Sequence, residues 1–212
     1  MFEIRNLKYQ EVLEIPELSI KPGVTVIAGA SGSGKTTLLR LLNKSISPTE
    51  GSITYNGTEL KEIPSVKLRR EVLLLSQQPA IFNGDLRHNL EIGFKFQNKA
   101  LPSEKAMLEM LQQVHLNKTL ETEVRLLSGG EKQRLVIARV FLLAPAVFLL
   151  DEPSSALDDV TEESVIRLVV EKARRDGQSI IMVTHSKAVA AQFADEIIEL
   201  EDGKIKDRGA RS

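Results

Sequence analysis

The chain has 212 residues, of which 42% are hydrophobic and 27% charged, as expected for a soluble globular protein with one hydrophobic core. Its 28 Lys and Arg nearly balance its 29 Asp and Glu, and this balance argues against electrostatic binding to nucleic acid. The chain has no cysteine, which excludes disulfide bonds and thiolate metal sites.

The first part of the chain predicts short strands that lead to a glycine-rich loop. Two β-like stretches, Phe2–Leu7 and roughly Val12–Ile20, come first. Val24–Ala28 then reads as a buried strand, because it is short, rich in β-branched residues and followed by glycine. After the glycine-rich stretch Gly29–Gly34, four leucines give Lys35–Lys44 the apolar stripe of a helix.

The middle of the chain changes from strands to helices. A second β region is expected over about residues 51–75. Helical patterns replace it over residues 79–127, and Pro102-Ser103 opens one of these helices. We interpret residues 79–127 as a small helical subdomain inserted into a nucleotide-binding core made of residues 1–78 and 128–212.

The last part of the chain alternates helices and strands. The predicted elements are a helix that begins after Ser128, a strand over 146–150, a helix over about 160–176, a strand over 179–184, a helix over 187–194 and a closing hairpin around Asp202-Gly203. Ser128 and Glu131 have the spacing of a capping box. This alternation predicts an α/β fold with a parallel sheet covered on both faces.

The glycine-rich loop reads GASGSGKT and matches the phosphate-loop pattern G-x-x-x-x-G-K-[ST] between a strand and a helix. Its glycines let the backbone turn tightly and direct N–H groups at phosphate oxygens. We expect Lys35 to reach the β- and γ-phosphates of ATP, and the Thr36 hydroxyl to bind Mg²⁺. The predicted ATP-binding residues of this loop are Gly29, Ala30, Ser31, Gly32, Ser33, Gly34, Lys35, Thr36 and Thr37.

Two carboxylates follow the predicted buried strand over 146–150. At the carboxyl end of a parallel strand, Asp151 lies beside the phosphate loop and can hold Mg²⁺ or its water ligands. Glu152 can orient and deprotonate the attacking water, so we predict it as the catalytic base. The alternative is an ordinary solvated strand end, and a plain glycine-rich turn is the matching alternative for the loop.

A second anion-binding surface is predicted at the segment LSGGEKQR, which begins a helix. Ser128, Gly129 and Gly130 stand at the N-terminus of that helix, where backbone N–H groups attract anions. On spacing alone, a well-capped helix without a ligand is the alternative. At this point the sequence resembles the ATP-binding cassette (ABC) ATPases over essentially the whole chain, because LSGGEKQR is similar to their signature segment.

Other motifs carry the same resemblance in the same order. The segment SSALD, which ends at Asp158, resembles the family's D-loop. His185 resembles the switch histidine that contacts the γ-phosphate, and the resemblance implies catalytic roles for His185, Glu152 and Lys35. Gln77, five residues before Phe82, resembles the Q-loop glutamine that meets Mg²⁺ and senses the permease.

Tyr9 is the candidate for the aromatic residue that stacks on adenine in the family. Its segment is shorter than the family's common pattern, so core packing of the ring stays open as the alternative. Neither His88 nor His115 matches a motif, and both are interpreted as ordinary surface or helical histidines.

The resemblance implies a P-loop NTPase (RecA-like) fold with a parallel sheet core, an N-terminal antiparallel β subdomain and a small inserted α-helical subdomain. It also implies a head-to-tail homodimer around two ATP molecules, each held by Gly29–Thr37 of one subunit and Ser128–Gly130 of the other. Two anion-binding helix ends so far apart in one chain favour such an arrangement, since they do not easily serve one nucleotide.

Membrane association is expected through a partner. The N-terminus shows no apolar secretory segment, and the longest apolar run, Val140–Leu150, is far shorter than the ~20 residues that cross a bilayer. We therefore expect a cytoplasmic subunit, peripheral on the inner face of the cell membrane, that drives a separate integral membrane permease and binds no nucleic acid.

Within the ABC ATPases, the compact insert and the run SQQPAIFNGDLRHNL look most like small bacterial ATPases that pair with a metal-export or iron-export permease. ATPases of lipoprotein-release and macrolide-type exporters are alternatives. A soluble ABC ATPase acting in DNA repair or translation is an alternative from another class, although such relatives usually carry coiled coils or two cassettes. A P-loop kinase would need an acceptor site and no signature segment.

Overall fold

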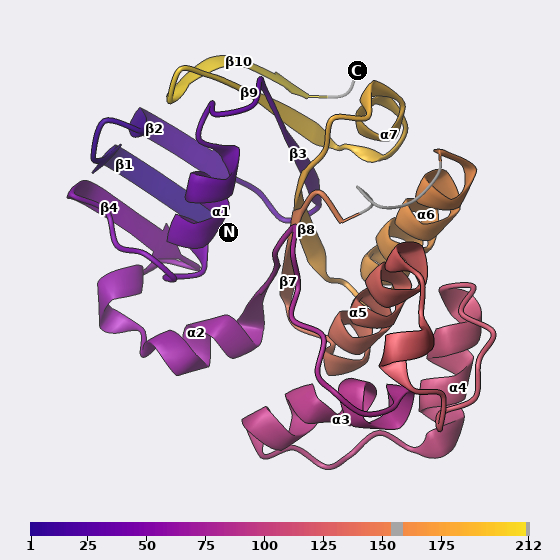
Figure 1. Ribbon diagram of the computed structural model, residues 1–212. Helices are drawn as coiled ribbons and strands as arrows, with labels where there is room; N and C mark the ends of the chain where they lie inside the picture. The colour runs from indigo at the N-terminus through magenta and orange to yellow at the C-terminus, as the bar shows by residue number, and fades with distance from the viewer. Residues whose placement is uncertain (154–158, 211–212) are drawn as a thin grey trace.

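The computed structural model of the chain describes residues 1–153 and 159–210, and its larger sheet has six strands in the order β10-β9-β3-β8-β7-β6 (Figure 1). Neighbouring strands are parallel except in the β9–β10 hairpin. The strands are β3 (Val24–Ala28), β6 (Val72–Leu75), β7 (Val147–Asp151), β8 (Ser179–Val183), β9 (Glu196–Glu201) and β10 (Lys204–Ala210). Every residue of β7 and β8 is buried, which explains why these segments read as continuous apolar runs.

The smaller sheet has four antiparallel strands in the order β2-β1-β4-β5. They are β1 (Phe2–Tyr9), β2 (Leu13–Ile20), β4 (Glu50–Tyr55) and β5 (Thr58–Glu59). Buried side chains such as Phe2 and Ile4 alternate with more exposed ones, as in a sheet with one face in the core. The predicted antiparallel N-terminal β subdomain is confirmed.

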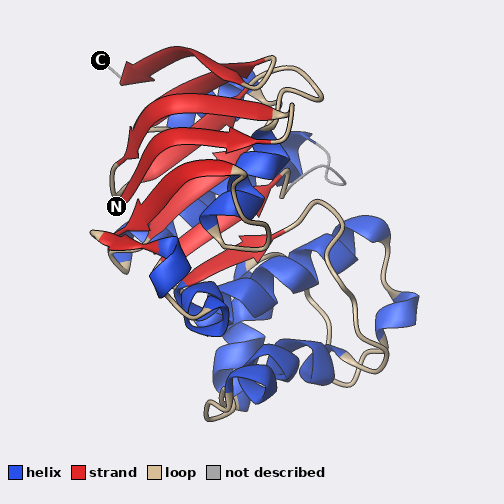
Figure 2. Ribbon diagram, turned by 90° about the vertical axis from the view of Figure 1, so that its left-hand side faces the viewer, coloured by secondary structure: helices blue, strands red, loops and turns tan. Residues whose placement is uncertain are grey.

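Seven α-helices lie within the described residues, and Figure 2 shows that some of them form a part of the molecule apart from the strands. The helices are α1 (Lys35–Leu42), α2 (Ser65–Glu71), α3 (Leu86–Gln97), α4 (Glu104–Gln113), α5 (Gly129–Leu143), α6 (Asp159–Arg175) and α7 (Lys187–Phe193), with 3₁₀ turns η1 (Leu60–Glu62) and η2 (Val124–Leu126). Helices α3 and α4 pack against α5, below the sheets in the view of Figure 1.

Two hydrophobic clusters hold these layers together, one on each face of the parallel sheet. Phe148 and Leu150 of β7 point to the face covered by α3, α4, α5 and α6. Val147 and Leu149 point to the other face, where α1 is enclosed by the two sheets. Each fully buried aliphatic side chain contributes about 1.5–3 kcal/mol relative to an exposed one. Helix α1, which follows the glycine-rich loop, is therefore fixed on both sides.

One prediction about this fold was wrong. The β region expected over residues 51–75 contains a helix, α2, between β5 and β6. Lys, Leu, Arg and Glu give the segment SVKLRRE a good helix propensity, and the preceding Pro64 favours the start of a helix. Leu68 anchors α2 in the core, and the β-like residues on both sides concealed this short element.

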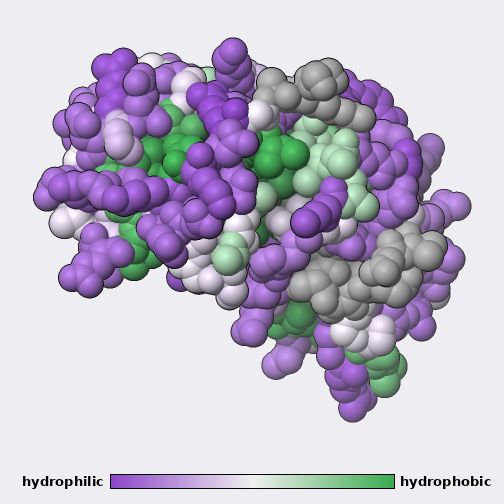
Figure 3. Space-filling view, turned by 90° about the horizontal axis from the view of Figure 1, so that it is seen from above, coloured by the Kyte–Doolittle hydropathy of each residue, from purple (hydrophilic) through white to green (hydrophobic). Residues whose placement is uncertain are grey.

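The molecular surface is mainly hydrophilic on the face seen in Figure 3, where apolar side chains gather in several small groups. Among the residues that the structure describes, no helix combines the length and apolarity needed to cross a membrane.

Candidate nucleotide site

The glycine-rich loop joins β3 to α1 and is pressed between two strands. Gly29 has a φ of +144°, and a Cβ there would lie 2.1 Å from the carbonyl oxygen of Leu200 in β9. Gly34 has a φ of +99°, and a Cβ there would lie 2.6 Å from a methyl carbon of Leu13 in β2. The backbone carbonyl leaves no room for a side chain at Gly29, and the positive φ of Gly34 is one that other residues rarely adopt, so both positions require glycine.

Lys35, the first residue of α1, turns back into the loop, and only 6% of its surface is exposed. Its ammonium group donates to the carbonyl oxygens of Gly29 at 2.9 Å and Ala30 at 2.6 Å. Burial lowers the pKa of Lys35, and the charges of Glu152 and Asp151 act in the opposite direction. The positively charged ammonium group of Lys35 therefore lies inside the loop, beside the N-terminus of α1.

The environment of the Ser33 hydroxyl indicates whether the loop can accommodate a phosphate. Its hydroxyl is buried and has no hydrogen-bond partner among the described residues. Such a group is unfavourable unless a ligand or water completes it. A phosphate oxygen inside the loop would supply that partner, and the positive N-terminal end of α1 attracts the same anion. The loop thus fits a nucleoside triphosphate.

Asp151, the last residue of β7, lies next to α1. The Thr36 hydroxyl donates to its Oδ1 at 3.1 Å, and only 4% of the Asp151 surface is exposed. Burial raises the pKa of Asp151, and the hydrogen bond from Thr36 counteracts part of that rise. A hydroxyl and a carboxylate are the hard oxygen ligands that Mg²⁺ prefers. The pair therefore fits Mg²⁺, whose charge would compensate for the burial of the carboxylate.

Glu152 follows Asp151 with a backbone φ of 49°, in the left-handed region. A non-glycine residue in this region is uncommon and carries strain that the surrounding structure must overcome. The N–H of Glu152 donates to the carbonyl oxygen of Val183, at the end of β8, at 3.0 Å. The neighbouring strand therefore fixes the turn that presents the Glu152 side chain.

The carboxylate of Glu152 joins two side chains from distant parts of the sequence. Its Oε2 accepts a hydrogen bond from Nε2 of Gln77, after β6, at 2.7 Å. Its Oε1 lies 3.0 Å from Nε2 of His185, which is exposed after β8. Strands β6, β7 and β8 are parallel neighbours, so residues beyond their carboxyl ends meet. We call Gln77, Glu152 and His185 the carboxylate cluster.

The sequence predicts Gln77 as a Mg²⁺ ligand, whereas its amide lies on Glu152 in this structure. The oxygen pair of Thr36 and Asp151 is formed without it. No sequence pattern signals the bond between Gln77 and Glu152, because it depends on how the segment after β6 runs across the end of β7. The buried Ser33 hydroxyl has no separate signal either, since its environment comes from the folded loop.

The signature segment forms the start of α5, with the predicted capping box. The Ser128 hydroxyl accepts from the Glu131 N–H at 3.2 Å, and the Ser128 N–H donates to the Glu131 carboxylate at 2.8 Å. This bond to the backbone lowers the pKa of Glu131. Ser128 and Gly129 are exposed, and no hydrogen bond between described residues joins Ser128–Gly130 to Gly29–Thr37. Within one chain, the two anion-binding surfaces are separate.

Of the last two predicted site residues, Tyr9 and Asp158, the structure describes only Tyr9. Tyr9, at the end of β1, is half-buried and packs against the core between the two sheets. This contact agrees with the core-packing alternative for part of the ring and leaves the rest accessible. Asp158 and the other residues of SSALD lie outside the described residues.

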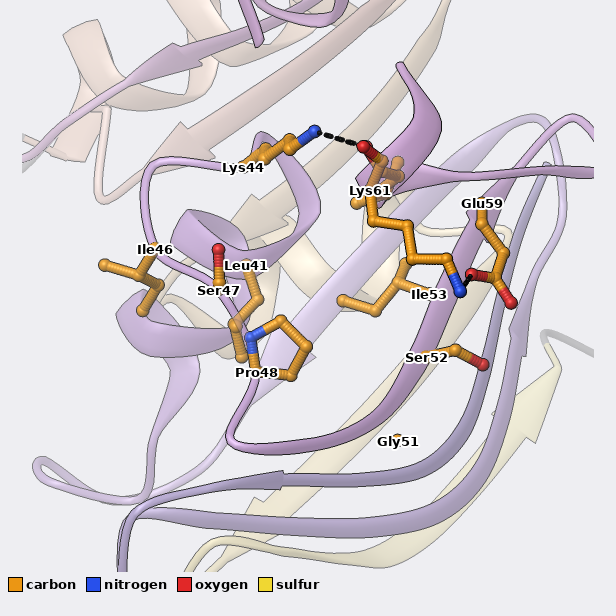
Figure 4. A pocket seen from close by; sticks show the side chains of 11 residues that line it. Leu41, Lys44, Ile46, Ser47, Pro48, Gly51, Ser52, Ile53, Glu59 and Lys61 are labelled. Atoms are coloured by element: carbon orange, nitrogen blue, oxygen red, sulfur yellow. Dashed lines mark hydrogen bonds and ion pairs between the residues drawn. The ribbon is translucent and has the colours of Figure 1, made fainter. Parts of the chain in front are cut away.

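A separate pocket of about 270 Å³ lies at the end of α1 away from the phosphate loop (Figure 4). The ammonium group of Lys44 at its rim donates to the carbonyl oxygens of Leu60 at 2.6 Å and Ile63 at 2.7 Å. Glu59 pairs with Lys61 on the other side. None of the predicted site residues lines this pocket.

The geometry defines the class of the protein. A glycine-rich loop with a buried lysine follows β3, and a hydroxyl–carboxylate pair and a second carboxylate meet it at the end of β7. This arrangement is that of a P-loop nucleoside triphosphatase. The signature segment at the start of α5 restricts the class further.

Comparison with known proteins agrees with that class. The model of the family described as ABC transporter matches residues 13–155. A putative ABC transporter ATP-binding protein of Pyrococcus horikoshii is 34% identical, over 99% of this chain and 84% of that protein. Multidrug resistance protein 1 of Entamoeba histolytica is 35% identical over 93% of this chain. The chain belongs to the ABC transporter family, as an ATP-binding cassette ATPase domain.

The comparisons also show how this chain relates to other proteins in length and in fold. The chain spans only 16% of the Entamoeba protein, which is thus much longer than one such domain. A solved ATP-binding cassette, described as a dimer in a post-hydrolysis state with ADP and Pi bound, is similar with a TM-score of 0.87 and 28% identity. The similarity covers 100% of this chain and 99% of that one. The P-loop NTPase fold is therefore confirmed over the full length.

Proposed function

We propose that this chain is the ATP-binding and ATP-hydrolysing subunit of an ABC transporter. One observation carries the proposal: the Glu152 carboxylate is held between Gln77 and His185, next to the Thr36–Asp151 pair. Attack by water on a terminal phosphate needs a general base close to a metal-binding pair and a phosphate loop, and Glu152 has this position. The reaction converts ATP and water into ADP and inorganic phosphate.

Binding uses the phosphate loop and the oxygen pair. Backbone N–H groups of Gly29–Thr37 and the Lys35 ammonium bind the β- and γ-phosphates, and the Ser33 hydroxyl gains a partner. Thr36 and Asp151 would hold Mg²⁺, whose charge would neutralise negative charge on the phosphate oxygens. The Lys35 ammonium, which donates to the carbonyl oxygens of Gly29 and Ala30 in this structure, turns to the phosphate oxygens in the proposed complex.

Hydrolysis uses Glu152 as the general base. The carboxylate orients a water molecule and accepts its proton while the new oxygen–phosphorus bond forms and the bond to ADP breaks. Gln77 and His185 each take up one lone-pair direction of the Glu152 carboxylate in this structure, and its other lone pairs can still accept a hydrogen bond from water. We expect the exposed His185 side chain to turn from Glu152 toward the γ-phosphate when the nucleotide binds.

A second copy of the chain completes each nucleotide site in this proposal. Its Ser128, Gly129 and Gly130 cover the γ-phosphate held by Gly29–Thr37. The exposed start of α5, unconnected to the phosphate loop of its own chain, supports this arrangement. The similar cassette described as a dimer supports it as well.

Energy from hydrolysis drives a separate membrane permease in the proposed complex. The permease binds near the Q-loop and the helical subdomain of residues 79–127, at the inner face of the cell membrane, while residues 1–78 and 128–212 form the nucleotide-binding core. Export of a metal ion is the transport class that we propose, on the basis of the compact insert and the run SQQPAIFNGDLRHNL.

The dimer proposal is tested with Ser128→Arg in a Glu152→Gln background, where slow hydrolysis preserves an ATP-bound dimer. We expect the parent to elute as a dimer with ATP, and the added arginine to keep it monomeric with unchanged ATP affinity. Ser103→Arg is the matched control, because the Ser103 hydroxyl also caps a helix by accepting from an N–H, of Ala106, at 3.2 Å, but that helix is α4. It should dimerise and lose only about 1 kcal/mol of stability.

A Ser128→Arg variant that still dimerises with ATP would refute the proposed sandwich. Loss of dimerisation in both variants would show instead that helix capping, and not the signature surface, controls assembly. ATP-dependent phosphate release by the wild-type chain, measured in parallel, tests the hydrolytic activity independently of the dimer.

A further inference from the structure

Arg139 is a buried cation in the middle of the fold, on α5. Only 8% of its surface is exposed, and burial lowers the pKa of its guanidinium to about 10, so it stays charged at neutral pH. Its Nη2 donates to the carbonyl oxygen of Ala80 at 2.7 Å, and its Nη1 has no partner among the described residues. The guanidinium lies 5.2 Å from the centre of the Phe82 ring.

The contacts of Arg139 are unusual for a buried arginine, because none of its described partners is a carboxylate. A buried charge without an opposite charge is unfavourable, and an apolar side chain of similar size is often at least as stable in such a place. Packing alone therefore does not account for an arginine here. The hydrogen bond and the cation–π contact of Arg139 both join it to one short segment, residues 80–82, between β6 and α3.

A second buried polar side chain holds the same segment. Asn89 of α3 is fully buried; its Oδ1 accepts from the Phe82 N–H at 3.0 Å and its Nδ2 donates to the Phe82 carbonyl oxygen at 2.8 Å. The Phe82 ring also meets the ring of Phe96, with centroids 5.9 Å apart. Phe82 is thus held by α3, and Ala80 is held by α5.

The other end of the segment lies at the carboxylate cluster. Gln77, three residues before Ala80, donates to Glu152 at 2.7 Å. Residues 77–82 therefore connect Glu152 to helices α3 and α5, and we call this stretch the strap. Ala80 is only three residues from Gln77, so the two positions are at most about 10 Å apart along the chain, and the fixation of Ala80 restricts where Gln77 can lie.

We propose that Arg139 is a positioning residue for ATP hydrolysis, which holds the strap so that Gln77 reaches Glu152. This inference rests on the proposed function. Because Arg139 belongs to the helix that begins at the Ser128 signature, a movement of α5 when a second copy binds is transmitted through Ala80 to the Gln77–Glu152 bond. Arg139 itself does not touch the reacting atoms.

The test compares Arg139→Met and Arg139→Lys with the wild-type chain. Methionine fills the site without charge, so we expect ATP affinity to be unchanged and the unfolding temperature to be unchanged or higher. We expect kcat to fall about 10-fold while KM stays within about twofold, as for a loss of catalytic geometry. Lysine keeps the charge and one donor, and its kcat should lie between the two. Lysine also serves as the test variant if the methionine variant does not fold.

A double-mutant cycle separates positioning from a structural role. In a Gln77→Ala background, Arg139→Met should have almost no further effect on kcat, because the strap has lost the group that it positions. Arg174→Met is the control for loss of an arginine elsewhere: Arg174 donates to the carbonyl oxygen of Phe193 at 3.1 Å and to the carboxylate of Asp195 at 2.6 Å, and none of its described contacts is to the strap. That variant should keep the wild-type kcat.

Hydrogen–deuterium exchange without nucleotide gives a second readout. We expect faster exchange over residues 77–82 in Arg139→Met than in the wild type, and no such change in Arg174→Met. A wild-type kcat in Arg139→Met, an equal loss of kcat with and without Gln77, or unchanged exchange in the strap would each overturn the inference. Failure of the wild-type chain to hydrolyse ATP would refute the proposed function instead, and exchange in the strap would still report the contact.

Discussion

The phosphate loop and the carboxylate cluster meet at one edge of the sheet but are built in opposite ways. The loop consists of consecutive residues, and Lys35 closes it through carbonyl oxygens only five and six positions away. In the cluster, Gln77 and His185 lie 75 and 33 positions from the Glu152 that they contact. One site is local in sequence, and the other exists only in the folded sheet.

This difference predicts how ATP binding and turnover respond to substitutions in the two regions. The loop places the Lys35 ammonium, its glycine turns and the N-terminus of α1 together through local contacts, a geometry that suits phosphate binding. The cluster is held by side-chain hydrogen bonds and by the strap from Gln77 to Phe82. We therefore expect substitutions in the loop to affect affinity and substitutions in the cluster to affect turnover.

Glu152→Gln has the largest expected effect and tests the cluster side of this comparison. The amide cannot accept the proton of water, so kcat should fall by about 10²–10⁴-fold while ATP affinity is retained. The variant should also accumulate as an ATP-bound dimer. Phosphate release and a fluorescent-nucleotide titration measure the two quantities. Normal turnover would remove Glu152 from its proposed role.

Lys35→Met tests the loop side. Loss of the charge-assisted bonds to phosphate should weaken ATP binding by about 10–100-fold. Lys44→Met is the matched control, since its ammonium also donates to backbone carbonyls but at the far pocket. It should reduce stability and leave affinity unchanged. The comparison between the regions fails if Lys35→Met binds ATP as the wild type does and loses only turnover.

Asp151→Asn has the smallest expected effect, and it separates metal binding from folding. Because the folded-state pKa of Asp151 is raised above its ordinary value of 3.8, the folded chain binds this proton more tightly than the unfolded chain. The stabilisation from this group is therefore complete below that value and is lost as pH rises through the folded pKa.

At pH 7 without metal or nucleotide, Asp151→Asn should consequently unfold at a higher temperature than the wild type. The difference should shrink as the pH is lowered toward 4, and Mg²⁺-dependent hydrolysis should be impaired at pH 7. Thermal unfolding monitored by circular dichroism at both pH values measures the first effect. A lower unfolding temperature at pH 7 would contradict the assigned sign.

Several features of this protein were predictable because each depends on neighbouring residues. The phosphate loop between strand and helix, the capping box of Ser128 and Glu131, and the carboxylates after a buried strand are all confirmed as local geometry. The roles of the site residues, and the boundaries of the helical subdomain, stay predictions. The short helix α2 was missed, since its seven residues lie between β-like stretches without a long apolar period.

The sequence by itself determined the class of the protein, because spacing within a loop, a strand end or a helix start is fixed by the local backbone. Only the tertiary structure decided that β6, β7 and β8 are parallel neighbours, that Glu152 therefore meets Gln77 and His185, and that Arg139 holds the strap. These contacts depend on long-range strand pairing and on burial against distant elements, which no local pattern in the chain specifies.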